Sequence, residues 1–139
     1  MIGYAFVVGD LFHFGILRFL EMAKQTCDFL IVGVLTDEAA ASYKRRPVIP
    51  LDERVDIIRS LKCVDMAVTQ NSRDPSETLK RLISDGWDVK LLIHGDDWPE
   101  IPGSEYMKSV GGRVIRTPYY QGKSTTKIIE TIIDRGVGT

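Results

Sequence analysis

The sequence predicts a single α/β domain built on a parallel β-sheet that is covered by helices on both faces. Short apolar runs alternate with segments of helical periodicity along the 139 residues, and this alternation is typical of βαβ units. The run Phe29–Leu35 is rich in isoleucine, valine and leucine, as expected of a strand buried on both faces. No repeat or linker divides residues 1–139, so we expect one domain.

Five runs are expected to form the strands of this sheet. They are Ala5–Val8, Phe29–Leu35, Met66–Thr69, Lys90–His94 and Arg113–Arg116. In open parallel sheets, ligands bind beyond the carboxyl ends of the strands, where the strand order reverses and helix N-termini converge. The residues that directly follow these strands are therefore the candidates for a functional site.

The first two helices are predicted from apolar spacing and from charge. Apolar residues recur at helical spacing from Ile16 to Ala23, so a helix begins close behind the His13-Phe14-Gly15 turn and directs its N-terminus at that turn. A second helix is expected after Pro50. Two acidic residues stand in its first turn, where negative charge interacts favourably with the helix dipole.

Two later helices have recognisable starts. At Asp74-Pro75-Ser76-Glu77, aspartate can cap, proline fits the first helical position and glutamate completes a capping box, and Gly86 ends the helix. The last helix opens at Ser124-Thr125-Thr126, and Gly136 follows its end. Four residues form an apolar stripe on one of its faces, namely Ile128, Ile129, Ile132 and Ile133.

Charge and cysteine content argue against several classes of function. The chain has 18 Lys and Arg against 19 Asp and Glu, so no overall positive field favours nucleic acid. Cys27 and Cys63 lack C-x-x-C spacing and are expected to be reduced packing residues. No basic leader is present at the start, and no apolar run approaches the roughly 20 residues that span a bilayer. We therefore expect a cytoplasmic protein that binds neither nucleic acid nor membrane.

The first candidate site is the glycine-flanked turn between the first strand and the first helix. Gly9 and Gly15 allow close approach of the backbone, and the helix start offers free N–H groups to an anion. His13 can donate to a phosphate oxygen. A histidine that only caps the turn would explain the same pattern.

The second candidate follows the apolar run Lys90–His94. Gly95, Asp96, Asp97 and Trp98 place two carboxylates and an indole at the same edge of the sheet, where they could hold a base or sugar and form the wall of a site. The alternative is an Asx-type turn with the tryptophan packed over it. His94 itself is expected to be structural.

The remaining candidates are a hydroxyl-rich helix start and a basic loop. Gly122, Ser124 and Thr125 can surround a phosphate with backbone amides and hydroxyls, although capping alone explains much of this pattern. The run Lys44-Arg45-Arg46, with Arg54 beyond it, supplies the cations that a triphosphate and its transition state require. Basic loop residues are, however, most often solvated.

Together these pieces resemble the nucleotidyltransferases of the cytidylyltransferase type, particularly the small glycerol-3-phosphate cytidylyltransferases. The resemblance covers nearly the whole chain and rests on the order and spacing of the pieces, which are more specific than any one of them. The pieces are His13-Phe14-Gly15, Thr36-Asp37-Glu38, Glu53-Arg54, Val64-Asp65, Gly95-Asp96-Asp97-Trp98 and Ser124-Thr125-Thr126-Lys127-Ile128.

This resemblance implies a Rossmann-like, doubly wound sheet of five parallel strands. It implies transfer of CMP from CTP to a small phosphorylated alcohol or phosphonate, with release of pyrophosphate, help from Mg²⁺ that accompanies CTP, and a homodimer. In that family an H-x-G-H turn, the Ser/Thr start of the last helix and a loop lysine bind the triphosphate, so catalytic roles fall on His13 and Lys44. The nucleotide-binding residues implied are Gly9, Asp10, His13, Gly15, Ile16, Arg45, Gly95, Asp96, Asp97, Trp98, Tyr119, Gly122, Ser124 and Thr125. No residue is assigned as a metal ligand.

The chain departs from the family pattern at three places. Ile16 stands where the family has its second histidine, and an isoleucine cannot hydrogen-bond to a phosphate. Tyr119 stands where the family has an arginine, although Arg116 is close by in sequence. The usual G-[TS]-F-D strand exit reads Val7-Val8-Gly9-Asp10.

These departures leave three interpretations. The first is a cytidylyltransferase that is either slow or compensated by another donor such as Arg116 or Lys44. The second is a nucleotide-binding or interaction domain that derives from such an enzyme and has lost its activity. The third is adenylyl transfer, as in the related pantetheine-phosphate and flavin enzymes, which fits Gly95-Asp96-Asp97-Trp98 less well.

Overall fold

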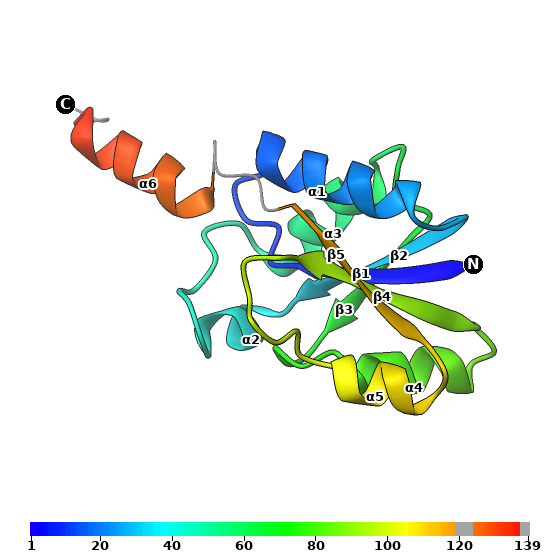
Figure 1. Cartoon of the computed structure of the whole chain (residues 1–139). Coiled ribbons are helices and arrows are strands. Elements are labelled where there is room, and N and C mark those ends of the chain that lie inside the picture. The colour runs from blue at the N-terminus through cyan, green and yellow to red at the C-terminus, as the bar shows by residue number, and fades with distance from the viewer. Residues whose placement is uncertain (119–123, 137–139) are drawn as a thin grey trace.

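The computed structural model describes residues 1–118 and 124–136, and within them it shows one five-stranded parallel sheet (Figure 1). The strand order is β3-β2-β1-β4-β5. The strands are β1 (Ile2–Val7), β2 (Phe29–Leu35), β3 (Met66–Gln70), β4 (Val89–Gly95) and β5 (Arg113–Thr117). The predicted fold class is confirmed. β1 begins three residues earlier than predicted because Ile2, Gly3 and Tyr4 pair with both β2 and β4, which buries positions whose sequence alone does not indicate a strand.

The helices are α1 (Phe14–Gln25), α2 (Asp37–Ala41), α3 (Leu51–Arg59), α4 (Ser76–Ser84), α5 (Ser104–Ser109) and α6 (Thr125–Asp134). The helices α1, α3, α4 and α6 lie where the sequence predicts them. The short helices α2 and α5 are not predicted from the spacing of apolar residues. α2 and α5 have only five and six residues, too few to show a helical repeat.

The start of α4 differs from the expected capping box. The Asp74 carboxylate accepts a hydrogen bond from the backbone N–H of Ser76 at 2.9 Å, and the helix begins at Ser76. Glu77 forms an ion pair with Lys80 at 3.3 Å. Pro75 occupies the N-cap position instead of the first helical position that the sequence predicts, and no side-chain cap hydrogen bond is formed there.

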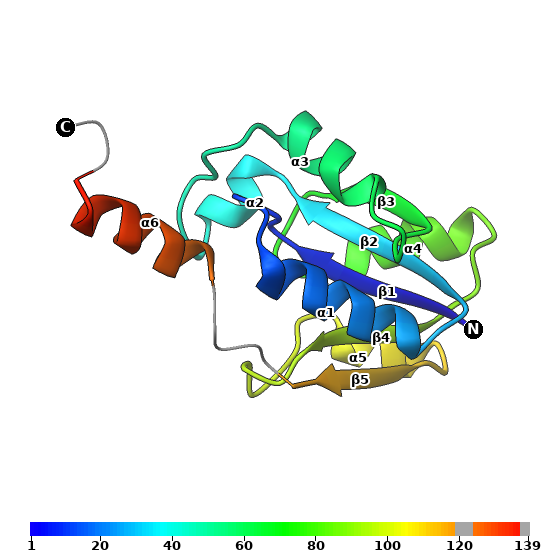
Figure 2. The same cartoon turned by 90° about the horizontal axis from the view of Figure 1, so that it is seen from above.

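Helices cover both faces of the sheet, as Figures 1 and 2 show. One apolar core joins the sheet to α1 and α3 through Leu20, Ala23 and Ile58. The other joins it to α4 and α5 and contains Leu79 and Met107. β2 is buried along nearly its whole length, as its sequence predicts.

The last helix, α6, lies outside these layers. Figures 1 and 2 show it beyond the carboxyl ends of the strands, and none of its residues is buried. Ile132 and Ile133 are 44% and 70% exposed. The predicted isoleucine stripe is therefore present but does not join either core. The Thr125 hydroxyl donates a hydrogen bond to the main-chain oxygen of Asp10 at 2.8 Å. This bond connects the start of α6 to the loop that follows β1.

Arg54, fully buried at the start of α3, ties the ends of two strands to the following loop. Its guanidinium donates to the main-chain oxygens of Val8 and Leu35 at 2.6 and 2.7 Å and to that of Ile49 at 2.9 Å. It also pairs with Asp37 at 2.6 Å. Arg54 is thus a structural residue in this fold, and its charge is not presented to a ligand.

Two further expectations concern cysteine and membrane. Cys27 and Cys63 are both free and partly buried, as the sequence predicts. Among the described residues, the structure has no helix whose length and apolarity would let it cross a bilayer.

Candidate functional site

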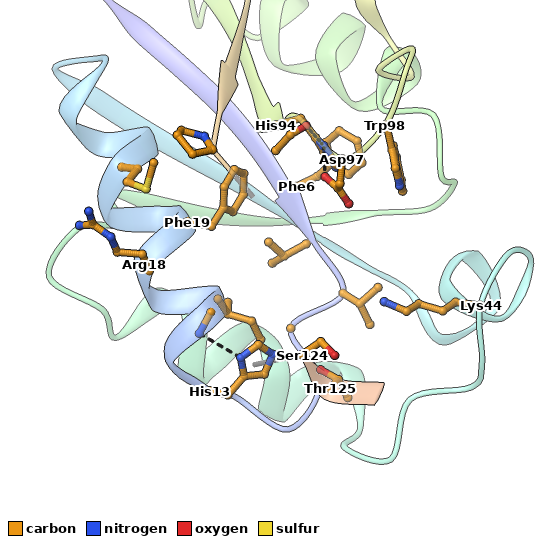
Figure 3. Close-up of a pocket in the computed structure, with 18 of the residues that line it drawn as sticks. Phe6, His13, Arg18, Phe19, Lys44, His94, Asp97, Trp98, Ser124 and Thr125 are labelled. Carbon is orange, nitrogen blue, oxygen red and sulfur yellow. Dashed lines mark hydrogen bonds and ion pairs between the residues drawn. The ribbon is translucent and has the colours of Figure 1, made fainter. Parts of the chain in front are cut away.

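A pocket of about 220 Å³ opens where β1 and β4 lie side by side and the strand order reverses (Figure 3). Its lining comes from the ends of both strands, from α1, from the loop after α2 and from the start of α6. This position agrees with the rule that ligands of open parallel sheets bind beyond the carboxyl ends of the strands. The lining residues are Phe6, Val7, Val8, Gly9, His13, Gly15, Ile16, Arg18, Phe19, Met22, Tyr43, Lys44, His94, Gly95, Asp97, Trp98, Pro118, Ser124 and Thr125.

His13 caps α1 and still presents a donor to the pocket. Its Nδ1 accepts a hydrogen bond from the backbone N–H of Gly15 at 3.0 Å. Burial and the nearby Lys44 charge lower the pKa of His13 below its usual 6.5. The ring is therefore neutral at pH 7, with Nδ1 unprotonated and the proton on Nε2. Capping and phosphate donation, which are alternatives at the sequence level, use different nitrogens and are compatible.

The backbone amides at the start of α1 are less available than expected. The N–H of Gly15 binds His13 Nδ1, and the N–H groups of Ile16 and Leu17 both bind the His13 main-chain oxygen at 3.2 Å. The Ile16 side chain, one turn from His13 on the same side of the helix, lines the pocket. An anion at this turn would therefore interact with the helix dipole and with His13 Nε2. At position 16, however, it would contact an apolar side chain.

The start of α6 supplies a second anion-binding element. The Ser124 Oγ accepts a hydrogen bond from the Lys127 N–H at 3.1 Å, and Ser124 and Thr125 line the pocket. Among the described residues, no partner is shown for the N–H groups of Thr125 and Thr126, as is usual in the first turn of a helix. These amides and the helix dipole favour a phosphate.

Asp10 holds the basic loop in place. Its carboxylate is 4% exposed and accepts hydrogen bonds from the backbone N–H groups of Val48 and Ile49, both at 2.9 Å. Gly9, which precedes it, has φ +75°, a conformation that favours glycine. Asp10 therefore acts on the site through the loop, and its side chain does not line the pocket.

The three basic residues of the loop have different partners. Lys44 lines the pocket, and Figure 3 shows its amino group directed into it. Burial and the charge of Arg45 lower the pKa of Lys44, while Asp97 acts in the opposite direction. Arg45 donates to the Thr126 hydroxyl at 2.8 Å, which links the loop to α6. Arg46 is 68% exposed and pairs with Asp37 at 3.6 Å. Only Lys44 of this run faces the pocket.

The segment after β4 forms the opposite wall. Gly95, Asp97 and Trp98 line the pocket, whereas Asp96 is exposed and its N–H binds the Thr117 main-chain oxygen at 2.9 Å. His94 lines the pocket too and stacks on Trp98, with ring centroids 4.4 Å apart. His94, which the sequence suggests is only structural, is therefore also part of the pocket wall.

Arg116 does not substitute for the arginine that the family pattern places at position 119. Its guanidinium donates to the main-chain oxygens of Trp98 and Pro99 at 2.6 and 2.9 Å and does not line the pocket. Tyr119 and Gly122, both implied as nucleotide-binding residues, lie outside the described residues.

An apolar side of the pocket escapes the sequence analysis. Phe19 and Met22 of α1 line it together with Phe6 and Pro118. Spacing of three residues from Ile16 through Phe19 to Met22 could have identified this face, but the same periodicity also describes a core stripe. Leu20 and Ala23 do enter the core, so one helix divides its apolar residues between core and pocket.

Both histidines predict a loss of stability in mild acid. The pKa of His94 is lowered mainly by burial, as is that of His13. The unfolded chain therefore binds more protons than the folded one as the pH falls through 6.5, and the free energy of unfolding should decrease. Urea unfolding at pH 7.5 and 5.5, at constant ionic strength, measures this. The double variant His13→Asn, His94→Phe should flatten the dependence. Unfolding free energy that rises as the pH falls would contradict the assignment.

Comparison with known proteins identifies the family. A family model described as cytidylyltransferase-like matches residues 9–131. Curated relatives named bifunctional protein HldE include that of Trichlorobacter lovleyi, 35% identical over 130 residues, which are 91% of this chain and 26% of the relative. The protein of Geotalea uraniireducens is 36% identical over 127 residues, with coverages of 88% and 25%. The chain thus spans about a quarter of the length of these relatives.

Solved structures share the fold. The lipopolysaccharide core biosynthesis protein from Thermoplasma volcanium superposes with a TM-score of 0.72 at 22% identity, over 87% of this chain and 98% of that one. A protein of unknown function from Archaeoglobus fulgidus gives 0.64 at 16% identity, with coverages of 89% and 94%. With the family model matching the segment that carries nearly the whole pocket, these findings show that the chain belongs to the cytidylyltransferase-like family of nucleotidyltransferases.

Proposed function

We propose that this chain transfers CMP from CTP to a small phosphorylated alcohol or phosphonate and releases pyrophosphate. The observation that supports this most is the convergence of His13 Nε2, Lys44 and the start of α6 on one pocket at the reversal of the strand order. These groups are donors and cations, which is what a nucleoside triphosphate requires.

The chemistry asks the protein for positioning and for charge stabilisation. An oxygen of the acceptor phosphate attacks the α-phosphorus, the bond from that phosphorus to the bridging oxygen of the β-phosphate breaks, and pyrophosphate leaves with its electron pair. The attacking oxygen is already an anion, so no general base is needed. His13, Lys44 and the α6 amides would hold the triphosphate in line and stabilise the charge that develops on it.

Mg²⁺ is proposed to enter with the nucleotide. Among residues 1–118 and 124–136, no three His, Cys, Asp or Glu side chains are grouped in a way that could hold a metal ion. Mg²⁺ commonly binds substrate phosphates and needs few protein ligands, so a Mg²⁺–triphosphate complex fits this donor set. Bound there, the ion would neutralise charge on the phosphates. We also propose, from the family resemblance, that the protein acts as a cytoplasmic homodimer.

A nucleotide-binding domain without turnover is the second candidate. The observation in its favour is Ile16, whose side chain faces the pocket at the place where the family pattern has a histidine. Both candidates predict nucleotide binding, and only the first predicts pyrophosphate release.

Replacement of Lys44 by methionine should weaken CTP binding by about 10-fold to 100-fold, since a hydrogen bond to a charged group contributes roughly 1.5–3 kcal/mol. Calorimetric titration with Mg²⁺ and CTP measures the dissociation constant. Arg46→Met is the matched control, because Arg46 is in the same basic run but does not line the pocket. The CTP dissociation constant of this variant should differ from that of the wild type by less than about threefold. If the wild type and Lys44→Met bound CTP with equal affinity, Lys44 would not be part of the nucleotide site.

A further inference from the structure

Arg73 lies outside the pocket but stacks on two of its wall residues. It is exposed in the loop between β3 and α4, and its guanidinium carbon lies 4.7 Å from the ring centroid of Tyr43 and 4.4 Å from that of Trp98. No carboxylate among the described residues forms an ion pair with it. Its charge is therefore left to interact with the two rings.

The Trp98 ring is in contact with His94, Arg73 and Tyr43. His94 stacks on it at 4.4 Å with an interplanar angle of 25°, and Arg73 lies over it at the same distance. Tyr43 approaches the ring edge-on, at 5.9 Å and 84°.

These contacts connect two loops that lie far apart in the sequence. Tyr43 directly precedes Lys44, and Trp98 directly follows Asp97, and all four residues line the pocket. Figure 3 shows Asp97 and Trp98 above Lys44 in the view, with the Lys44 amino group directed into the cavity. The Trp98 backbone is also held by Arg116. The Tyr43 ring packs against the apolar core and also contacts Trp98 and Arg73.

We propose that Arg73 is a positioning residue of the nucleotide site, which fixes Tyr43 against Trp98 and thereby sets the separation of Lys44 and Asp97 across the pocket. This inference rests on the proposed function only for its effect on nucleotide affinity. The ordering of the two rings is a property of the protein without ligand and can be measured separately.

The test uses Trp98 as a reporter. The chain has two tryptophans, and Trp87→Phe leaves Trp98 alone. In that background, Arg73→Met should increase quenching of Trp98 fluorescence by acrylamide and weaken CTP binding about tenfold through the loss of two cation–π contacts. Arg73→Lys keeps a cation over the rings and should retain most of both properties. Arg113→Gln, an exposed charge change on β5, should alter neither.

Two outcomes would overturn the inference: quenching that is unchanged in Arg73→Met, or an Arg73→Lys variant that behaves like Arg73→Met. A wild-type protein that binds neither CTP nor ATP would instead refute the proposed function, and the quenching of the ligand-free variants would still decide the role of Arg73. Thermal unfolding of each variant checks that the fold is retained.

Discussion

Replacement of Ile16 by histidine should raise the rate of pyrophosphate release by about 10²-fold to 10³-fold, which is the usual effect of one preorganised donor on a phosphoryl or acyl transition state. Ile16 is one helical turn from His13, and both side chains line the pocket. A histidine at position 16 would therefore direct a second imidazole at the phosphates, next to His13 Nε2.

The rate gain has a matched control. Ile16→Leu keeps an apolar side chain of the same size and adds no donor, so its rate should equal that of the wild type. Steady-state rates with saturating CTP, Mg²⁺ and one acceptor compare the three proteins. A gain below tenfold for Ile16→His, with the fold intact, would show that position 16 is not what limits the rate.

Replacement of Arg54 by methionine should lower the free energy of unfolding by about 3–5 kcal/mol, the cost of breaking a buried charged pair from one side. The guanidinium is fully buried and binds three main-chain oxygens as well as Asp37. Methionine fills part of the volume but leaves these oxygens without a donor, and unpaired buried acceptors are destabilising.

Urea unfolding at pH 7.5 measures this cost. Arg59→Met is the control, because Arg59 belongs to the same helix but is 63% exposed and, within residues 1–118 and 124–136, pairs with Asp56 alone. It should change the unfolding free energy by less than about 0.5 kcal/mol. An Arg54 variant as stable as the Arg59 variant would contradict the structural role described above.

The central strands of the sheet could be predicted from sequence because β1, β2 and β4 are rich in apolar residues. Phe29–Leu35 has the same bounds in the sequence analysis and in the structure. The sequence also predicts a site at the carboxyl edge of the sheet, and the structure shows that β1 and β4 are the strands that meet there, where the strand order reverses. α2 and α5 could not be found in this way, because one or two turns show no periodicity.

The partners of polar side chains were the least predictable part of the site. A basic residue near a phosphate-binding motif can face the ligand, as Lys44 does, or bind the protein itself, as Arg54 and Arg116 do. Asp10 has the same ambiguity, and the structure uses its carboxylate to hold the loop at residues 48 and 49. Such choices depend on which main-chain groups lack partners in the folded chain, and that information is absent from local sequence.

CMP transfer by this protein can be measured as pyrophosphate release from the purified protein with Mg²⁺ and either CTP or ATP, over a panel of small phosphates and phosphonates. We expect release with CTP that depends on one class of acceptor and is lost in Lys44→Met. Nucleotide binding without release would support the inactive binding domain instead, and release with ATP but not CTP would replace cytidylyl by adenylyl transfer. If the protein neither bound CTP or ATP nor released pyrophosphate from them, that result would contradict the assignment of the pocket as a nucleotide site.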